Sequence, residues 1–301
     1  MIVESEFQKR RYQTRYIFYL HVSLIIENMK TLENHMILFD GDCPMCNIYT
    51  QAFVRSGMLG ENGRAAYQSS MDNICPVIDK QRAVNEIALV DLKNGEVTYG
   101  IPSLFKVIGN ACPVFKPLLE FRPFAWLMSK LYAFISYNRR VIIPAPTIGN
   151  AYAYQPTFKV QYRIAYLLFT WFCTGFILTA YAHLLTAVVP IGNSLREYFI
   201  CGGQIIFQGL IICAYARKDF WTYLGNMMTI SFAGSLLLLL PIILHHWFIL
   251  PAISFPLYFM GAAGLMLLEH IRRTKLLALG GTLTITWVLY RVALLVLILV
   301  A

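Results

Sequence analysis

Charged residues are scarce in this chain, and they are scarcest in its second half. Asp, Glu, Lys and Arg make up 14% of the 301 residues, 57% are hydrophobic, and the mean hydropathy is +0.56. Residues 162–301 hold only 8 of the 25 Lys and Arg and 3 of the 16 Asp and Glu. This composition excludes an ordinary soluble protein of the same length. It predicts a soluble region followed by a membrane region.

The membrane region is expected to be an all-α bundle of about five transmembrane helices within residues 162–301. Helices are expected because, in lipid, a helix satisfies its own backbone polar groups. The expected spans cover 163–189, 198–216, 223–250, the segment after Pro251 to His270, and 276–301. Small residues would allow close helix packing within the bundle, namely Gly202, Gly203, Gly209, Gly261 and Gly264. Prolines between 144 and 161 mark a linker before the first span.

A concentrated basic stripe is also missing. The net charge of +9 is shared almost equally between the two regions, so it does not indicate a nucleic-acid surface. In a membrane protein such an excess is typical of loops that face the cytoplasm and anionic lipid headgroups. We therefore expect a lipid bilayer as partner and no nucleic acid.

A second closely spaced cysteine pair is absent, although the chain has seven cysteines. Only Cys43 and Cys46 stand three positions apart, and structural zinc sites usually show two such pairs. A zinc site from Cys43, Cys46, Cys75 and Cys112 stays open as the less favoured alternative. The cysteines of the membrane region, Cys173, Cys201 and Cys213, are expected to be small apolar fillers.

The stretch from Met36 to Cys46 carries the strongest chemical signal. Met36 to Phe39 is a short apolar run stopped by Asp-Gly-Asp, which predicts a buried strand and a turn. Apolar residues after Pro44 recur at helical spacing, so Cys43 is expected at a helix N-terminus. A cysteine there has a pKa of roughly 3.5–7.5 instead of about 8.5. We expect an exposed Cys43 to be the nucleophile and Cys46 to be the resolving thiol.

Two carboxylates precede this cysteine pair in the sequence. Asp40 ends the predicted strand beneath the cysteines and is a candidate proton acceptor for Cys46. Asp42 is a candidate cap for the helix. The expected catalytic residues are therefore Cys43, Cys46 and Asp40.

The spacing Asp40-x-x-Cys43-x-x-Cys46 resembles the signature of the DCC family of thiol-disulfide oxidoreductases. The resemblance extends over about 36–140, through the Asn94-Gly95 turn, Gly100 and the run from Tyr137 to Arg140. It implies an α/β thioredoxin-like domain over residues 36–143. One departure is that Arg82 to Asn85 stands where such enzymes usually carry a cis-proline, so the mode of substrate docking does not follow.

The pattern of the remaining domain fits this expectation. A second strand is predicted at 64–69, a hairpin with strands at 86–92 and 96–99, and a helix at 102–108. A closing helix is expected to pack on the sheet through Phe124, Leu127, Met128, Leu131, Phe134 and Ile135. Residues 1–35 form an N-terminal extension whose apolar stretch, 16–26, is short for a span, so an over-extended start or a loose surface helix is the preferred interpretation.

Polar residues in the predicted spans leave a further question. Haem or quinone ligation by two of His183, His245, His246 and His270 is a less favoured alternative. Arg291 lies deep in the last span, where a charge usually pairs with a partner or lines a cavity. Glu269 lies too near the end of its span to be an obvious partner.

The sequence thus predicts a membrane-anchored enzyme that exchanges disulfides, in the reducing direction, with protein or small-molecule thiols and disulfides. No cofactor is expected beyond the dithiol. The alternative is a membrane transport or scaffold protein whose Cys-x-x-Cys domain senses redox state or binds metal. Lys and Arg gather in alternate loops, which predicts a multi-pass protein of a bacterial plasma (inner) membrane with the thiol domain in the cytoplasm.

Overall fold

The structure is a computed structural model that describes residues 29–68, 78–144, 157–186, 188–190 and 192–300. The chain divides into two compact units, residues 1–136 with 149–156 and residues 137–148 with 157–301. Most of the predicted N-terminal extension and of the linker lies outside the described residues, as does Cys75.

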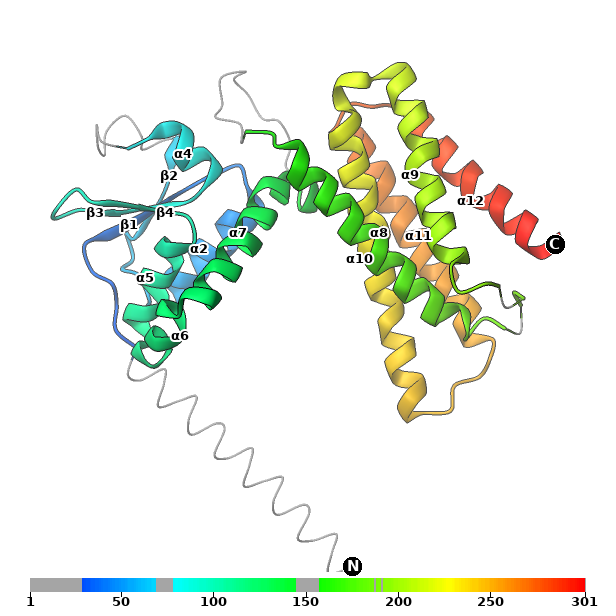
Figure 1. The fold of residues 1–301 in the computed structure, drawn as a ribbon, viewed down its shortest axis with the longest axis horizontal. Helices are drawn as coiled ribbons and strands as arrows, with labels where there is room; N and C mark the ends of the chain where they lie inside the picture. Colours follow the sequence, from blue (N-terminus) through cyan, green and yellow to red (C-terminus); the bar gives the residue numbers. More distant parts are fainter. Residues whose placement is uncertain (1–28, 69–77, 145–156, 187, 191, 301) are drawn as a thin grey trace, which may run out of the picture. The chain divides into compact units, whose positions relative to one another are not determined.

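The first unit is built on a four-stranded mixed sheet in the order β2-β1-β3-β4 (Figure 1). Strand β1 pairs in parallel with β2 and antiparallel with β3, and β3 pairs antiparallel with β4. The strands are β1 (His35–Phe39), β2 (Arg64–Ala66), β3 (Ala88–Asp91) and β4 (Val97–Tyr99). All four predicted strands are confirmed. Strand β2 is shorter than predicted because the chain turns into a helix at Tyr67.

Side chains that alternate along the strands divide the core of this unit into two layers. Ile37, Phe39 and Leu89 face a cluster with helices α2 (Pro44–Arg55) and α5 (Ile101–Ala111). Leu38 and its neighbours on β3 face the opposite cluster, which includes helix α4 (Lys80–Asn85). The sheet therefore lies between helices on both faces (Figure 1). An unbroken apolar strand such as β1 is expected where both faces are covered.

The turn between β3 and β4 follows the predicted Lys-Asn-Gly pattern. Gly95 has φ of 72°, the left-handed conformation that favours glycine. The Asp91 side chain organises the turn, because its Oδ1 accepts a hydrogen bond from the Lys93 N–H at 2.9 Å. This hydrogen bond is the main reason that the pKa of Asp91 lies below its ordinary value.

Three helices follow α5 in the chain: η1 (Pro113–Phe115), α6 (Lys116–Glu120) and α7 (Arg122–Ile142). Helix α7 is fixed to the first unit by Tyr132, whose hydroxyl accepts the Ile87 N–H at 3.0 Å. The expectation that its whole apolar stripe packs on the sheet is wrong for Leu127, Leu131 and Ile135, which are exposed. The stripe is wider than the face that the domain covers.

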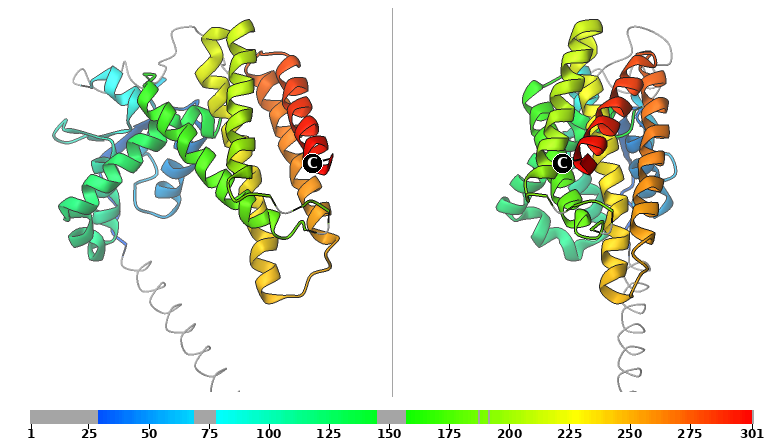
Figure 2. Two further views of the ribbon diagram at one scale, coloured as in Figure 1. Left: turned by 45° about the vertical axis from the view of Figure 1, so that its right-hand side comes forward. Right: turned by 90° about the vertical axis from the view of Figure 1, so that its right-hand side faces the viewer.

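The second unit contains five long helices that run side by side (Figure 2). They are α8 (Val160–Ala182), α9 (Arg196–Tyr215), α10 (Phe220–Trp247, preceded by the short η2, Arg217–Asp219), α11 (Ser254–Leu276) and α12 (Thr282–Val300). Among the described residues four helical segments are long and apolar enough to cross a membrane, rather than about five: α8, α9, η2 with α10, and α12. Helix α11 is long enough, but Glu269 and His270 make it less apolar.

Close helix contacts occur at only some of the predicted glycines. A Cβ atom at Gly203 would collide with the Tyr290 hydroxyl, and one at Gly202 would lie 3.2 Å from the Trp171 indole nitrogen. The expectation is wrong for Gly261 and Gly264, because no atom of the described residues lies within 4 Å of a Cβ placed there. Those two glycines therefore mark no contact between the described helices.

The last turn of α7 is held by a buried arginine of the helical unit. Arg273 Nη1 donates hydrogen bonds to the Val141 carbonyl at 2.6 Å and to Asn226 Oδ1 at 2.9 Å. Its Nη2 donates to the Ile142 carbonyl at 3.1 Å. The final carbonyls of a helix have no partner within the helix, and a guanidinium satisfies them. This explains why residues 137–142 belong to the second unit, although the sequence placed the boundary near 144.

Candidate functional site

The strand, turn and helix predicted around the cysteine pair are all present. Strand β1 ends at Phe39, and α2 begins at Pro44. Between them the Cys43 N–H donates to the Asp40 carbonyl at 3.0 Å, which closes a tight turn. The predicted position of Cys43 at a helix N-terminus is therefore confirmed.

Cys43 caps helix α2 with its own sulfur atom. Its backbone is extended, with φ of −93° and ψ of 108°, and its Sγ accepts a hydrogen bond from the Cys46 N–H at 3.5 Å. A helix N-terminus leaves its first N–H groups without partners in the helix and carries partial positive charge. Both effects favour the thiolate form of a cysteine at such a position, whereas burial in an apolar cluster favours the thiol. The cap that was expected from Asp42 is wrong, because Cys43 occupies that position.

Both sulfur-bearing residues are buried. Cys43 is 0% exposed and Cys46 is 3% exposed, so the expected exposure of Cys43 is wrong in this conformation. They lie in the same apolar cluster as Ile37, Leu59 and Val107. The cysteines are buried because helix α2 packs on the sheet. The first turn of α2, which carries both cysteines, faces the sheet, and residues further along the helix, such as Phe53, pack against the same cluster.

Asp40 is also buried, and a glutamine that the sequence did not single out holds it. Asp40 Oδ1 accepts hydrogen bonds from Gln68 Nε2 at 2.9 Å and from the Asp42 N–H at 3.2 Å. The Gln68 Oε1 atom accepts the Gly41 N–H at 2.9 Å. A reversed amide would place like groups against each other at both contacts, so the two partners fix its orientation.

The position of Gln68 follows from the pairing of parallel strands. Phe39 of β1 pairs with Ala66 of β2, so the carboxyl ends of these strands meet at one edge of the sheet. A polar residue just after the second strand, Gln68, was therefore the sequence signal that could have indicated the partner of Asp40. Gly41 completes this edge, because a Cβ atom there would lie 2.9 Å from the Ala66 Cβ. Asp40, Gly41 and Gln68 form one hydrogen-bonded turn beside the cysteines.

The zinc alternative needs four cysteines, of which the structure describes three, Cys43, Cys46 and Cys112. The described residues contain no group of three or more His, Cys, Asp or Glu side chains arranged to hold a metal ion. Cys112 is buried at the end of α5, and Cys75 lies outside the described part of the chain.

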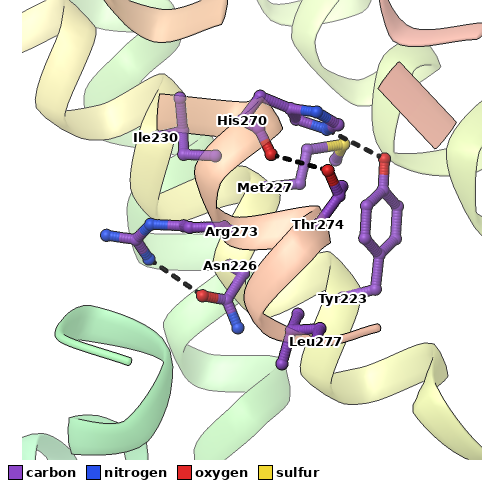
Figure 3. A pocket seen from close by; sticks show the side chains of 8 residues that line it. All are labelled: Tyr223, Asn226, Met227, Ile230, His270, Arg273, Thr274 and Leu277. Atoms are coloured by element: carbon purple, nitrogen blue, oxygen red, sulfur yellow. Dashed lines mark hydrogen bonds between the residues drawn. The ribbon is translucent and has the colours of Figure 1, made fainter. Parts of the chain in front are cut away.

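A second polar cluster lies inside the helical unit, around His270 (Figure 3). The His270 Nε2 atom lies 3.2 Å from the Tyr223 hydroxyl, and its Nδ1 lies 3.0 Å from Thr284 Oγ1. The Tyr223 hydroxyl donates its proton to Gln208 Oε1 at 2.8 Å. Because the Tyr223 hydroxyl has used its one proton, His270 Nε2 is the donor in its contact with Tyr223.

This cluster borders a narrow crevice between α10 and α11. Figure 3 shows the side chains that line it: Tyr223, Asn226, Met227, Ile230, His270, Arg273, Thr274 and Leu277. From the sequence, His270 was only one of four histidines near the predicted spans. The other three, His183, His245 and His246, are exposed. Residue type alone gave no signal that separated the buried histidine from the exposed ones.

Arg291 continues the cluster through stacked rings. Its guanidinium lies 4.3 Å from the centre of the Trp287 ring, and Trp287 stacks on His270 at 5.1 Å. Its Nη2 donates to Ser231 Oγ at 3.4 Å. Glu269 forms ion pairs with Arg272 and Arg273 on its own helix. The cation inside the predicted span is therefore accommodated by an aromatic face and a hydroxyl.

Comparison with known proteins adds no relative: no family model, no curated protein and no solved structure matches this chain.

Proposed function

We propose that the protein is a membrane-anchored thiol-disulfide oxidoreductase, as its resemblance to the DCC family implies. The observation that carries the proposal is the cap of helix α2, where Cys43 Sγ accepts the Cys46 N–H. A nucleophilic thiolate needs stabilised negative charge, and a second thiol one turn further along the helix is suited to resolve a mixed disulfide. Cys46 has that place.

The arrangement of the first unit supports the finer proposal of a thioredoxin-like domain. Its elements follow the order strand, cysteine-bearing helix, strand, helix, hairpin, helix, and helices cover both faces of the sheet. The cysteine pair lies directly after the central strand β1. At residues 82–85, where a cis-proline is usual, the chain forms part of α4, and the Asn85 carbonyl accepts a hydrogen bond from the Ser136 hydroxyl at 2.6 Å.

In the proposed reaction the protein reduces a disulfide of its substrate. The Cys43 thiolate attacks one substrate sulfur, the substrate S–S bond breaks, and the departing thiolate takes up a proton. Cys46 then loses its proton to Asp40 and attacks Cys43 Sγ, which releases the second substrate thiolate. Two electrons pass from the dithiol to the substrate, and a Cys43–Cys46 disulfide remains. A cellular dithiol must reduce it again before the next cycle.

Burial of the pair adds a step to this scheme. A substrate sulfur must approach Cys43 Sγ in line with the breaking bond, and the closed conformation leaves no exposed surface on that residue. We therefore include an opening of the turn at residues 40–43 before the attack. Hydrogen bonds from Gln68 and Asp42 to Asp40 hold this turn in the closed conformation.

A cytoplasmic position for the thiol domain is part of the proposal and rests on the positive-inside rule. With α11 counted as a fifth membrane helix, one side of the bundle carries Lys159, Arg163, Arg217, Lys218, Arg272, Arg273 and Lys275. The opposite side carries Arg196. A cytoplasmic dithiol faces a reducing thiol pool, which favours reduction of substrates. The membrane is proposed to be the inner membrane of a bacterium.

The main test is to trap the intermediate. Cys46→Ser is expected to accumulate a mixed disulfide on Cys43 when a model disulfide is added, and Cys43→Ser is expected to form none. Cys112→Ser is the matched control, because this cysteine is also buried in the first unit but stands apart from the pair. Mass spectrometry measures the adducts. Equal adducts in the Cys43 and Cys46 variants would contradict the assigned roles.

Turnover separates this function from a redox sensor or metal-binding module. With excess dithiol and model disulfide, the enzyme is expected to reduce many substrate molecules per protein, whereas a sensor changes state once.

The transport alternative is favoured by one observation, the buried cluster of His270, Tyr223 and Gln208, because polar groups inside spans often line transport pathways. If the purified chain shows no turnover but moves protons across vesicle membranes, that alternative replaces the enzyme.

Orientation has its own measurement. Ile48 is exposed on α2, so a cysteine introduced there is reachable by reagents. A membrane-impermeant maleimide is expected to label the Ile48→Cys variant only after cells are broken open. If the Ile48→Cys variant is labelled on intact cells more strongly than the protein without this substitution, the thiol domain lies outside the cytoplasm.

A further inference from the structure

The first unit exposes large apolar side chains on η1, α6 and α7 that its own core does not use. We call this set the apolar ridge, and it consists of Val114, Phe115, Leu118, Phe121, Trp126, Leu127, Leu131 and Ile135. Trp126 is 64% exposed and Val114 is 77% exposed. Soluble proteins rarely expose apolar patches larger than a few hundred Å² unless the patch binds something.

The ridge points outward because the opposite face of the same helices is fastened to the domain. Phe124 stacks on Phe105 of α5 with ring centres 6.1 Å apart. The Ser136 hydroxyl donates to the Asn85 carbonyl at 2.6 Å, and the Tyr132 hydroxyl accepts the Ile87 N–H. These contacts fix the rotation of α7 about its axis. The exposed apolar face is therefore a property of the folded unit.

Charge along the ridge indicates the chemistry of its partner. Lys116, Arg122 and Lys130 lie among the apolar residues, and Glu120 is the single acidic residue between 113 and 136. The Lys130 ammonium lies 5.9 Å from the centre of the Trp126 ring. Tryptophan, bulky apolar residues and interspersed Lys and Arg are typical of helices that lie in the headgroup layer of a bilayer. Anionic lipids attract such a positively charged surface.

A bilayer is also the partner that this chain always has nearby. The candidate spans begin at Val160, soon after α7 ends at Ile142 in the sequence. Residues tethered so closely to a span meet lipid at high effective concentration, so even weak interfacial binding is enough to hold them there. A soluble protein partner has no comparable advantage.

We propose that the apolar ridge lies in the headgroup region of the membrane that the same chain spans, with a preference for anionic phospholipid. The ridge is then a peripheral membrane contact of the first unit, separate from the transmembrane helices. This membrane contact does not depend on which activity the cysteine pair has. It fixes the face of the domain that is turned toward the bilayer.

Photo-crosslinking of the full chain in lipid nanodiscs tests this proposal. A benzophenone amino acid is placed at Leu127 or at Leu131, and the matched control position is Ile48, an exposed apolar residue on α2 of the same unit. After illumination, mass spectrometry counts phospholipid adducts. Several-fold more adduct is expected at positions 127 and 131 than at 48. Adducts are expected to increase when phosphatidylserine replaces part of the phosphatidylcholine.

A charge-reversal variant gives a second measurement. Lys116→Glu combined with Lys130→Glu changes only exposed positions and is expected to remove most of the increase caused by phosphatidylserine. The proposal is overturned if positions 127 and 131 give no more lipid adduct than position 48. It is also overturned if the crosslinks at 127 and 131 join a second copy, another protein or the transmembrane helices of the same chain instead of lipid.

Discussion

Both units have an apolar core, but they differ in the polar side chains that they bury and in the apolar side chains that they expose. Ile37 and Leu38 are fully buried in the sheet of the first unit, whereas Gln208 and His270 are as deeply buried in the helical unit. On the outside of the helical unit, Leu297 is 62% exposed. In water the hydrophobic effect drives apolar groups inward, but lipid removes that driving force, so packing and interhelical hydrogen bonds hold the helices together. This contrast fits a helical unit whose candidate spans pack in lipid.

The largest test of this comparison is the loss of Arg273. Arg273→Ala is expected to lower the free energy of unfolding by about 3–5 kcal/mol, because buried carbonyls of α7 and Asn226 lose their donor. Denaturant titration in detergent measures it. Arg272→Ala is the control, since this arginine pairs with the same Glu269 but its side chain is 54% exposed. The loss of Arg272 is expected to change the free energy of unfolding by less than about 1 kcal/mol. Equal effects of the two variants would contradict the stabilising role of the buried Arg273.

Truncation of Leu38 tests the apolar core of the first unit. Leu38→Ala is expected to cost about 2–5 kcal/mol, because it leaves a cavity between the sheet and α4. Hydrogen exchange of the β1 amides reports this unit separately from the helices. Leu297→Ala is the counterpart on the lipid-facing surface, where we expect a change within about 0.5 kcal/mol. Equal destabilisation of the two variants would contradict the difference between the buried Leu38 and the exposed Leu297.

Removal of one hydroxyl tests the cluster around His270. Tyr223→Phe is expected to destabilise the helical unit by about 1–3 kcal/mol, since Gln208 and His270 each lose a buried hydrogen-bond partner. Thermal unfolding in detergent measures the change. Tyr258→Phe removes an exposed hydrogen bond to the Leu237 carbonyl and serves as control. A larger loss for Tyr258 than for Tyr223 would show that the cluster adds little stability.

The smallest expected effect is the pH dependence from Asp91. Because the Lys93 N–H, with Asn94 and His35, holds the pKa of Asp91 below its ordinary value, the folded state binds this proton more weakly than the unfolded state. The stabilisation is present above the ordinary pKa of about 3.9 and is lost as pH falls through the folded value. Asp91→Asn should flatten the acid limb of the stability curve. An unchanged acid limb would exclude this role.

Much of the fold was predictable because its signals are local. The apolar run before Asp40, the Asn94-Gly95 turn and the long apolar segments each specify their element within a few residues. Burial of the cysteine pair and the partner of Asp40 were not predictable in this way. Gln68 stands far from Asp40 in sequence, and their contact depends on the register of two parallel strands. Such long-range pairings are set by tertiary structure.

The sequence by itself determined where the chain meets water and where it meets lipid, because composition and periodicity act over short windows. It also determined that Cys43 begins a helix, since Pro44 and the apolar repeat specify that end. Only the tertiary structure decided that Cys43 is buried, that Arg273 caps α7, and that the outer face of α7 stays uncovered. Burial depends on which surfaces face each other in the folded chain. A helix carries its own apolar stripe, but its neighbours decide how much of that stripe they cover.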